Sequence, residues 1–180
     1  MNITDLLLGK DSSDAVGALA RQFGVTEAQA RDAVAAMAPS LSRGMQHHTK
    51  QVSGIDDLMN ALKKGNHSRY IDDPGVLGLE ETTKDGNSIL GHILGSKEVS
   101  RNVATHASQK TGIGASLLKK MLPVVATMVM GTLGKSILGG GSAAPAQRQS
   151  TGILGTLLDS DKDGSIIDDV LGMAFKAAFR

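Results

Sequence analysis

The sequence predicts an all-α fold, a compact multi-helix bundle, and three observations support this prediction. Only 2% of the 180 residues are aromatic and none is Trp, so the core has to be built from Leu, Ile, Val, Ala and eight Met residues, a composition that favours closely packed helices. Apolar residues recur at spacings of three and four, which is the helical period. Most of these stretches also end at recognisable helix caps. A chain of this length can bury the core of one ordinary globular domain.

Two helices are predicted near the N-terminus. The first covers residues 13–24, where an apolar stripe ends at Gly24, a residue typical of C-terminal caps. The second follows at once, because Thr26 and Gln29 have the spacing of an N-terminal capping box. Its predicted core face consists of Ala30, Val34, Met37 and Leu41. The polar residues 43–51 are expected to connect this helix to the next one.

The middle of the chain alternates between helical and irregular patterns. Residues 53–65 predict a helix that ends in Lys63 and Lys64, whose charges favour a helix C-terminus. Residues 66–86 are expected to be irregular, because they contain the turn signals "DDPG" and "DG". A short helix is predicted near residues 88–95.

Two further helices are predicted over Val99–Lys110 and Ser116–Leu138. Pro123 lies inside the second pattern and is expected to kink the helix or to mark its first turn. The apolar run Met121–Leu133 is shorter than the roughly 20 residues that span a bilayer. It therefore predicts a buried core helix.

Composition changes after residue 138 and divides the chain into three parts. Residues 1–138 are expected to form the helical core domain, and the Gly/Ser/Ala/Pro-rich residues 139–151 a flexible linker. Residues 152–180 predict a C-terminal helical hairpin around an Asp-rich loop. The second helix of this tail carries its apolar residues on one face: Ile167, Val170, Leu171, Ala174, Phe175 and Ala178. Such a stripe is expected to dock on the main body or on another copy.

Two internal similarities occur. A duplicated helix pair is suggested by two Met-x-Pro motifs, at residues 37–39 and 121–123, each in a helix that follows a Gly. Residues 81–95 also align with residues 159–172 through a shared Lys-Asp-Gly, although Glu81 and Thr83 stand where the later copy has Asp159 and Asp161. The feature expected in both copies is an Asp-Gly turn followed by a helix cap.

The Asp-rich loop has two interpretations. Asp159, Asp161, Asp163 and Ser165 have the spacing of an EF-hand-like or dockerin-like calcium loop, and Asp169, one residue before the twelfth position, would complete the ligand set in a shortened loop. Val170 stands at the twelfth position, where such a loop has a bidentate Glu. In the other interpretation Asp163-Gly164 forms a turn, and Ser165 with Asp168 caps a helix. Calcium is the one cofactor that the sequence suggests.

Other classes of site find little support. The chain has no Cys, which excludes disulfides and thiolate metal sites. Neither His47-His48 nor the pair His92 and His106 has zinc-site spacing, and His92 is expected to be a hydrogen-bonded core or interface residue. No nucleophile or phosphate-loop motif is present, so we expect no enzymatic activity and identify no small-molecule substrate.

Composition also limits the expected partners and location. The formal net charge of +1 and the scarcity of aromatic residues argue against nucleic acid binding. Membrane contact is not favoured, because the most apolar helix is apolar on nearly every side. The N-terminal residues do not have the pattern of a signal peptide, so a cytoplasmic location is expected.

Several stretches together resemble the YidB-like bacterial family, filed as domain of unknown function 937. They are the opening "DLLLG", the "GVTEAQA" and "SLLKKMLPVVATMVMGTLGK" helices, and the closing "LLDSDKDGSIIDDVLGMAFK". The resemblance covers nearly the whole chain. It implies a small all-helical bacterial cytoplasmic protein without an established activity, so no catalytic residues carry over.

The leading functional hypothesis is a non-enzymatic helical module that associates with itself or with another protein through the tail helix and Met-rich apolar faces. One alternative is a calcium-binding module that uses residues 159–169. The other alternative is a protein that associates peripherally with membranes.

Overall fold

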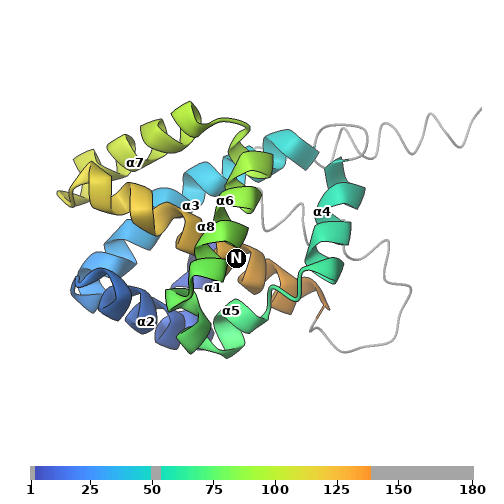
Figure 1. Ribbon diagram of the computed structural model, residues 1–180, viewed down its shortest axis with the longest axis horizontal. Coiled ribbons are helices and arrows are strands. Elements are labelled where there is room, and N and C mark those ends of the chain that lie inside the picture. Colours follow the sequence, from blue (N-terminus) through green and yellow to red (C-terminus); the bar gives the residue numbers. More distant parts are fainter. Residues whose placement is uncertain (1–2, 50–53, 139–180) are drawn as a thin grey trace, which may run out of the picture.

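The computed structural model describes residues 3–49 and 54–138 (Figure 1). These residues form eight α-helices and two short 3-10 helices, and they contain no strand, so the predicted all-α fold is confirmed. The elements are α1 (Ile3–Leu7), η1 (Lys10–Ser12), α2 (Ser13–Phe23), α3 (Glu27–Thr49), α4 (Gly54–Lys64), α5 (Arg69–Asp72), η2 (Pro74–Gly78), α6 (Glu80–Leu94), α7 (Lys97–Thr111) and α8 (Ala115–Leu138).

Helix α8 is the central element of the bundle. It contacts every other α-helix in the described chain, most extensively α6 and α7 (Figure 1). All residues from Met121 to Gly134 are buried, which confirms the prediction of a core helix. A helix that is apolar on all sides has to be surrounded by others, and this requirement explains why α8 lies in the middle.

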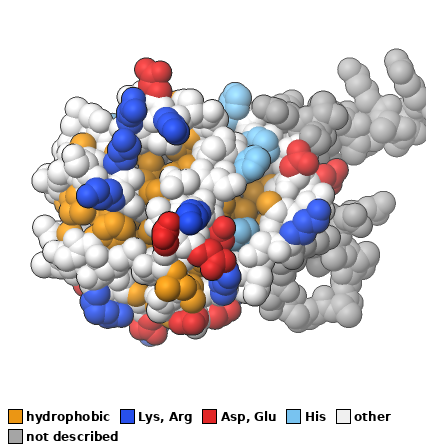
Figure 2. All heavy atoms as spheres, viewed as in Figure 1, with side chains coloured by type: hydrophobic (Ala, Val, Ile, Leu, Met, Phe, Trp, Pro, Cys, Tyr) orange, Lys and Arg blue, Asp and Glu red, His pale blue; other side chains and the backbone are white. Residues whose placement is uncertain are grey.

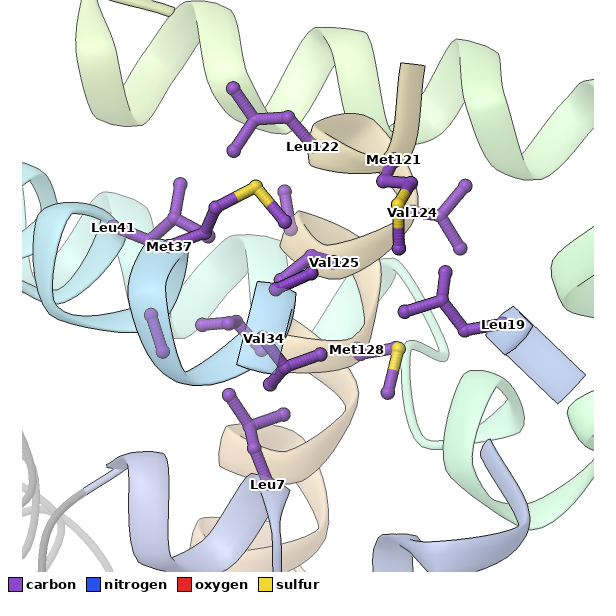
Figure 3. Packing of buried hydrophobic residues seen from close by; sticks show 14 of the residues in the cluster. Leu7, Leu19, Val34, Met37, Leu41, Met121, Leu122, Val124, Val125 and Met128 are labelled. Carbon is purple, nitrogen blue, oxygen red and sulfur yellow. The ribbon is translucent and has the colours of Figure 1, made fainter. Parts of the chain in front are cut away.

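The core fills the space where α1, α2 and α3 face α8. Figure 3 shows Leu7, Leu19 and Val34 pointing toward Val125 and Met128 of α8. The predicted core face of α3 is confirmed, because its members are all completely buried: Ala30, Val34, Met37 and Leu41. Unbranched Met side chains fill the irregular spaces between the helices.

Two predicted helix ends near the N-terminus, at Gly24 and Thr26, are also confirmed. The N–H of Gln29 donates to Thr26 Oγ1 over 3.1 Å, and the N–H of Thr26 donates to Gln29 Oε1 over 3.0 Å, which completes the capping box. Helix α2 ends at Gly24 with a left-handed φ of 66°, and α7 ends at Gly112 with a φ of 71°. Glycine adopts this conformation without the strain that a Cβ would cause.

The prediction of a polar connection at residues 43–51 is wrong as far as Thr49, because α3 continues to that residue. Met45 is 1% exposed and extends the core face by one turn beyond Leu41. Gly44 lets α3 approach α6 closely, since a Cβ there would lie 2.7 Å from Cγ2 of Ile93. Among the polar residues that suggested a loop, Arg43 and His47 are exposed, whereas Gln46 and His48 are half-buried.

The expected irregular stretch at residues 66–86 is only partly irregular, because it contains α5 and η2, and α6 already begins at Glu80. The "DDPG" turn is confirmed: the N–H of Gly75 donates to Asp73 Oδ1 over 3.1 Å. The "DG" turn is wrong, since Asp85 and Gly86 lie in the middle of α6. A Cβ on Gly86 would lie 2.1 Å from the carbonyl oxygen of Pro123, so the glycine permits close contact with α8 rather than a turn.

This result changes the interpretation of the internal similarities. The earlier Lys-Asp-Gly copy is helical, so the shared motif does not mark a turn in both copies. The two Met-x-Pro segments do have similar local structures: α3 and α8 each follow a left-handed glycine and each contain a proline. Pro123 is not in the first turn of α8. The proposed duplication of a helix pair stays a prediction.

Helix α8 is longer than its most apolar run. The segment Ala115–Ile137 is long and apolar enough to cross a membrane by length and composition, and 83% of its most apolar window is buried inside the bundle. A buried core helix has the same composition as a membrane span. Length and apolarity therefore do not decide where this protein is located.

Some predictions concern residues outside the described ranges. These are the linker at 139–151, the helical hairpin at 152–180 and the loop residues Asp159, Asp161, Asp163, Ser165 and Asp169.

Candidate functional site

A pocket of about 450 Å³ lies between α4 and the main bundle. Its walls come from α3, α4, α6, α8 and the segment after α4. The apolar lining residues are Met45, Leu58, Ala61, Ile89, Ile93 and Met130, and the polar ones are His48, Asp57, His67 and His92. In Figure 2, histidine side chains gather around a hydrophobic area between α6 and α4. The size and the mainly apolar lining are typical of sites that bind apolar groups.

Helix α4 forms the outer wall of the pocket. It stands at the edge of the bundle in Figure 1, and its main contacts are with α3 and α8. Leu58 and Leu62 are its buried leucines, at 7% and 1% exposure. The partly buried Met59 packs against the core as well, and a Cβ on Gly54 would lie 1.9 Å from the His48 carbonyl oxygen, so the start of α4 lies close to the end of α3.

His67 enters the pocket through a tight change of direction after α4. Asn66 has a left-handed φ of 42°, which Asn tolerates better than most residues. A Cβ on Gly65 would lie 1.9 Å from Nε2 of His67, and a Cβ on Gly131 would lie 2.6 Å from the His67 carbonyl oxygen. Two glycines on different elements thus make room for this residue, one for the ring and one for the backbone.

The His67 ring is buried and incompletely hydrogen-bonded. Its exposure is 9%, and Nδ1 has no hydrogen-bond partner among the described residues. Burial lowers the pKa of His67 below its usual value, against the opposite effect of the nearby Asp85 carboxylate. A neutral ring that donates to the Ala61 carbonyl keeps a lone pair for one more hydrogen bond. Nδ1 is thus an unpaired acceptor that is itself enclosed in the wall of the pocket.

A polar network holds the segment after α4 against α6. The Tyr70 hydroxyl donates to Asp85, and an Arg69 nitrogen donates to the Tyr70 hydroxyl over 2.8 Å and to Asp85 Oδ2 over 3.1 Å. Tyr70 is completely buried, and its ring stacks on that of His67 with 5.9 Å between the centroids. Burial and the bond to Asp85 raise the pKa of Tyr70, so the phenol stays protonated. This network positions His67 through Tyr70.

The histidines singled out from the sequence are distributed over different surfaces. His47 and His48 point apart: His48 lines the pocket, while His47 lines a shallow groove toward α7. His92 is exposed at the pocket, so its prediction as a core residue is wrong, because its helix face turns outward there. His106 is exposed on α7. Within residues 3–49 and 54–138, no group of three or more His, Cys, Asp or Glu side chains is arranged to hold a metal ion.

Sequence reasoning missed His67, which is the most deeply buried histidine of the pocket. Its neighbours in the sequence are polar, and its spacing to His48 and His92 follows no helical period. The only local signal is Gly65-Asn66, which indicates an unusual backbone conformation just before it. The remaining partners come from α6 and α8, far away in the sequence.

Comparison with known proteins identifies the family. A family model described as "bacterial protein of unknown function (DUF937)" matches residues 5–136. No curated protein and no solved structure matches the chain. The match begins within α1 and covers α2 to α7 and nearly all of α8, including every residue that lines the pocket. The chain therefore belongs to the DUF937 family of bacterial proteins.

Proposed function

We propose that this protein is a non-enzymatic helical module that associates with a second copy of itself by binding an apolar helix face in the pocket under α4. One observation carries this proposal: the pocket combines an apolar floor of Leu, Ile and Met side chains with a rim of imidazoles. Grooves that bind amphipathic helices have this kind of lining, and Met side chains adapt to different apolar partners.

The peripheral position of α4 supports the proposal. A helix at the edge of the bundle, in contact mainly with α3 and α8, can move outward by a small amount to admit a ligand. Polar side chains border the apolar floor as well: His48, Asp57 and His92. A bound polypeptide can form hydrogen bonds with these groups.

The test is the oligomeric state of the full chain, measured by light scattering over a wide concentration range. The variant Ala61→Trp places a large side chain in the pocket, and we expect it to weaken association by about tenfold or more, as loss of a central contact does. Ala28→Trp is the matched control, because Ala28 is an exposed alanine near the start of α3 and does not line the pocket. A monomer at every concentration would falsify self-association.

Calcium binding is a second candidate function, favoured by the spacing of Asp159, Asp161 and Asp163. Calorimetric titration of calcium into chelator-stripped protein tests it, with Asp161→Asn as the comparison. Saturable heat that the variant loses would support a metal site. No heat at millimolar calcium would leave the turn and helix-cap interpretation.

A further inference from the structure

We infer that the segment that fills the pocket under α4 is residues 166–178 of this chain, with its apolar stripe facing the pocket floor. The inference rests on the proposed function, because it names the segment that association uses. The stripe was defined from the sequence by Ile167, Val170, Leu171, Ala174, Phe175 and Ala178.

The position of α8 brings this segment near the pocket. Met130 lines the pocket, and α8 ends at Leu138, about 12 Å further along the helix axis at 1.5 Å per residue. The last turns of α8 run past α4 and α5: Gly134 lies beside Leu62, and Lys135 Nζ is 2.8 Å from Asp72 Oδ1. The chain therefore leaves the described bundle on the side where the pocket lies.

The length of the following sequence fits this distance. Residues 139–165 connect α8 to this segment, and a flexible stretch of that length has a typical end-to-end distance of about 30 Å. A binding segment on such a tether has an effective concentration in the millimolar range. Residues 166–178 can thus reach the pocket of the same chain, and the same contact exchanged between two chains gives a swapped dimer.

The chemistry of the segment matches that of the pocket. Branched aliphatic side chains and one Phe face a floor of Met45, Ile89 and Met130, and both surfaces are apolar. At the start of the segment, Asp168 and Asp169 can accept hydrogen bonds from rim imidazoles. An uncovered stripe of this size would expose apolar area to water, which favours burial against another surface.

The absence of cysteine permits a direct test by disulfide cross-linking of the full chain. The double variant Ala61→Cys with Ala174→Cys places one thiol at the pocket and one on the stripe. The control pair is Ala28→Cys with Ala174→Cys, whose first thiol lies away from the pocket. We expect the pocket pair to form its disulfide about tenfold faster or more, since docking raises the effective concentration of the thiols.

A second pair of variants tests which face of the segment docks. Ile167→Asp puts a charge on the stripe, whereas Ile166→Asp puts the same charge about 100° away around the helix. In the cross-linking assay, Ile167→Asp is expected to reduce the rate of the pocket pair to that of the control pair. Ile166→Asp is expected to leave the rate unchanged.

The outcomes separate this inference from the proposed function. Fast cross-linking of the pocket pair, within one chain or between two, supports residues 166–178 as the occupant. Equal rates for both pairs overturn the inference, even where association persists and Ala61→Trp weakens it, because another surface then fills the pocket. Fast cross-linking in a protein that stays monomeric supports the inference and overturns self-association.

Discussion

The surroundings of α8 and the edge formed by α4 are packed in different ways. Around the middle of α8, Val124, Val125 and Met128 are completely buried (Figure 3). Helix α6 approaches so closely there that a Cβ on Gly86 would lie 2.1 Å from the Pro123 carbonyl oxygen. At the edge, Leu58 is 7% exposed and borders a pocket of about 450 Å³. The surroundings of α8 are closely packed, whereas the apolar side chains of α4 border a cavity.

The difference indicates which part of the molecule holds the fold and which part is available for binding. Closely packed interiors lose stability when a side chain changes by even one methyl group. A wall beside a cavity tolerates such changes, because it has fewer contacts to lose. The following four predictions test this comparison, from the largest expected effect to the smallest.

Gly86→Val should lower the free energy of unfolding by more than about 3 kcal/mol, because even the Cβ would lie 2.1 Å from the Pro123 carbonyl oxygen and would force α6 away from α8. Chemical denaturation followed by circular dichroism measures the change. Gly91→Ala is the control on the same helix: a Cβ there meets nothing within 4 Å, so the substitution should stabilise the protein by about 0.5 to 1 kcal/mol. Equal effects of the two variants would contradict the close packing of α6 on α8.

Leu122→Ala should lower the free energy of unfolding by about 3 kcal/mol, because the Leu122 side chain is 1% exposed and its removal leaves a cavity in a closely packed region. Leu58→Ala on α4 should cost about 2 kcal/mol or less, since this leucine already borders the pocket. Denaturation midpoints of the two variants, measured side by side, test the difference. A larger loss for Leu58→Ala would reverse the comparison between the two regions.

Tyr70→Phe should lower the free energy of unfolding by about 1.5 kcal/mol, because it removes a hydrogen bond to the Asp85 carboxylate and leaves this group with fewer donors. The exposed pair of Lys84 with Glu80, 2.9 Å apart on the same helix, provides the control. Lys84→Ala should change stability by only a few tenths of a kcal/mol. If Tyr70→Phe left the free energy of unfolding unchanged, the network would not anchor α5 to α6.

His67 should make stability depend on pH in a defined direction. Because burial lowers its pKa in the folded state, the unfolded chain takes up the proton first as pH falls. The contribution of neutral His67 is therefore complete above about pH 6.5 and is lost as pH falls through the folded-state pKa. His67→Gln should lose less stability than the natural chain between pH 7 and pH 5.

Thermal melting at several pH values measures this effect, which we expect to be the smallest of the four. His106→Gln is the control, because His106 is exposed on α7 and does not touch the pocket. If both variants follow the pH dependence of the natural chain, the burial of His67 does not contribute to it.

Much of the fold could be predicted from local sequence signals. The capping box at Thr26 and Gln29 and the terminal glycine at residue 24 act within one turn of the chain, and both are confirmed. The predictions that failed depended on distant contacts. Gly44 and Gly86 were interpreted as loop and turn residues, but each is a point where a second helix approaches.

The candidate site was less predictable than the fold. His48 and His92 were considered in the sequence as possible metal ligands, whereas their common feature is the pocket that they line with His67. Nothing in the sequence spacing connects these residues, since they lie on three separate segments. The Asp-rich loop, by contrast, is a local motif and could be proposed from spacing alone.

By itself the sequence determined the helical class, most helix ends and the burial of the apolar run Met121–Leu133, because caps and periodicity act over a few residues. Only the tertiary structure decided that Gly86 is a contact point, that α3 extends to Thr49, and that a pocket lies under α4. The physical reason is that packing depends on atoms brought together from distant segments, and a cavity is a property of the space between them.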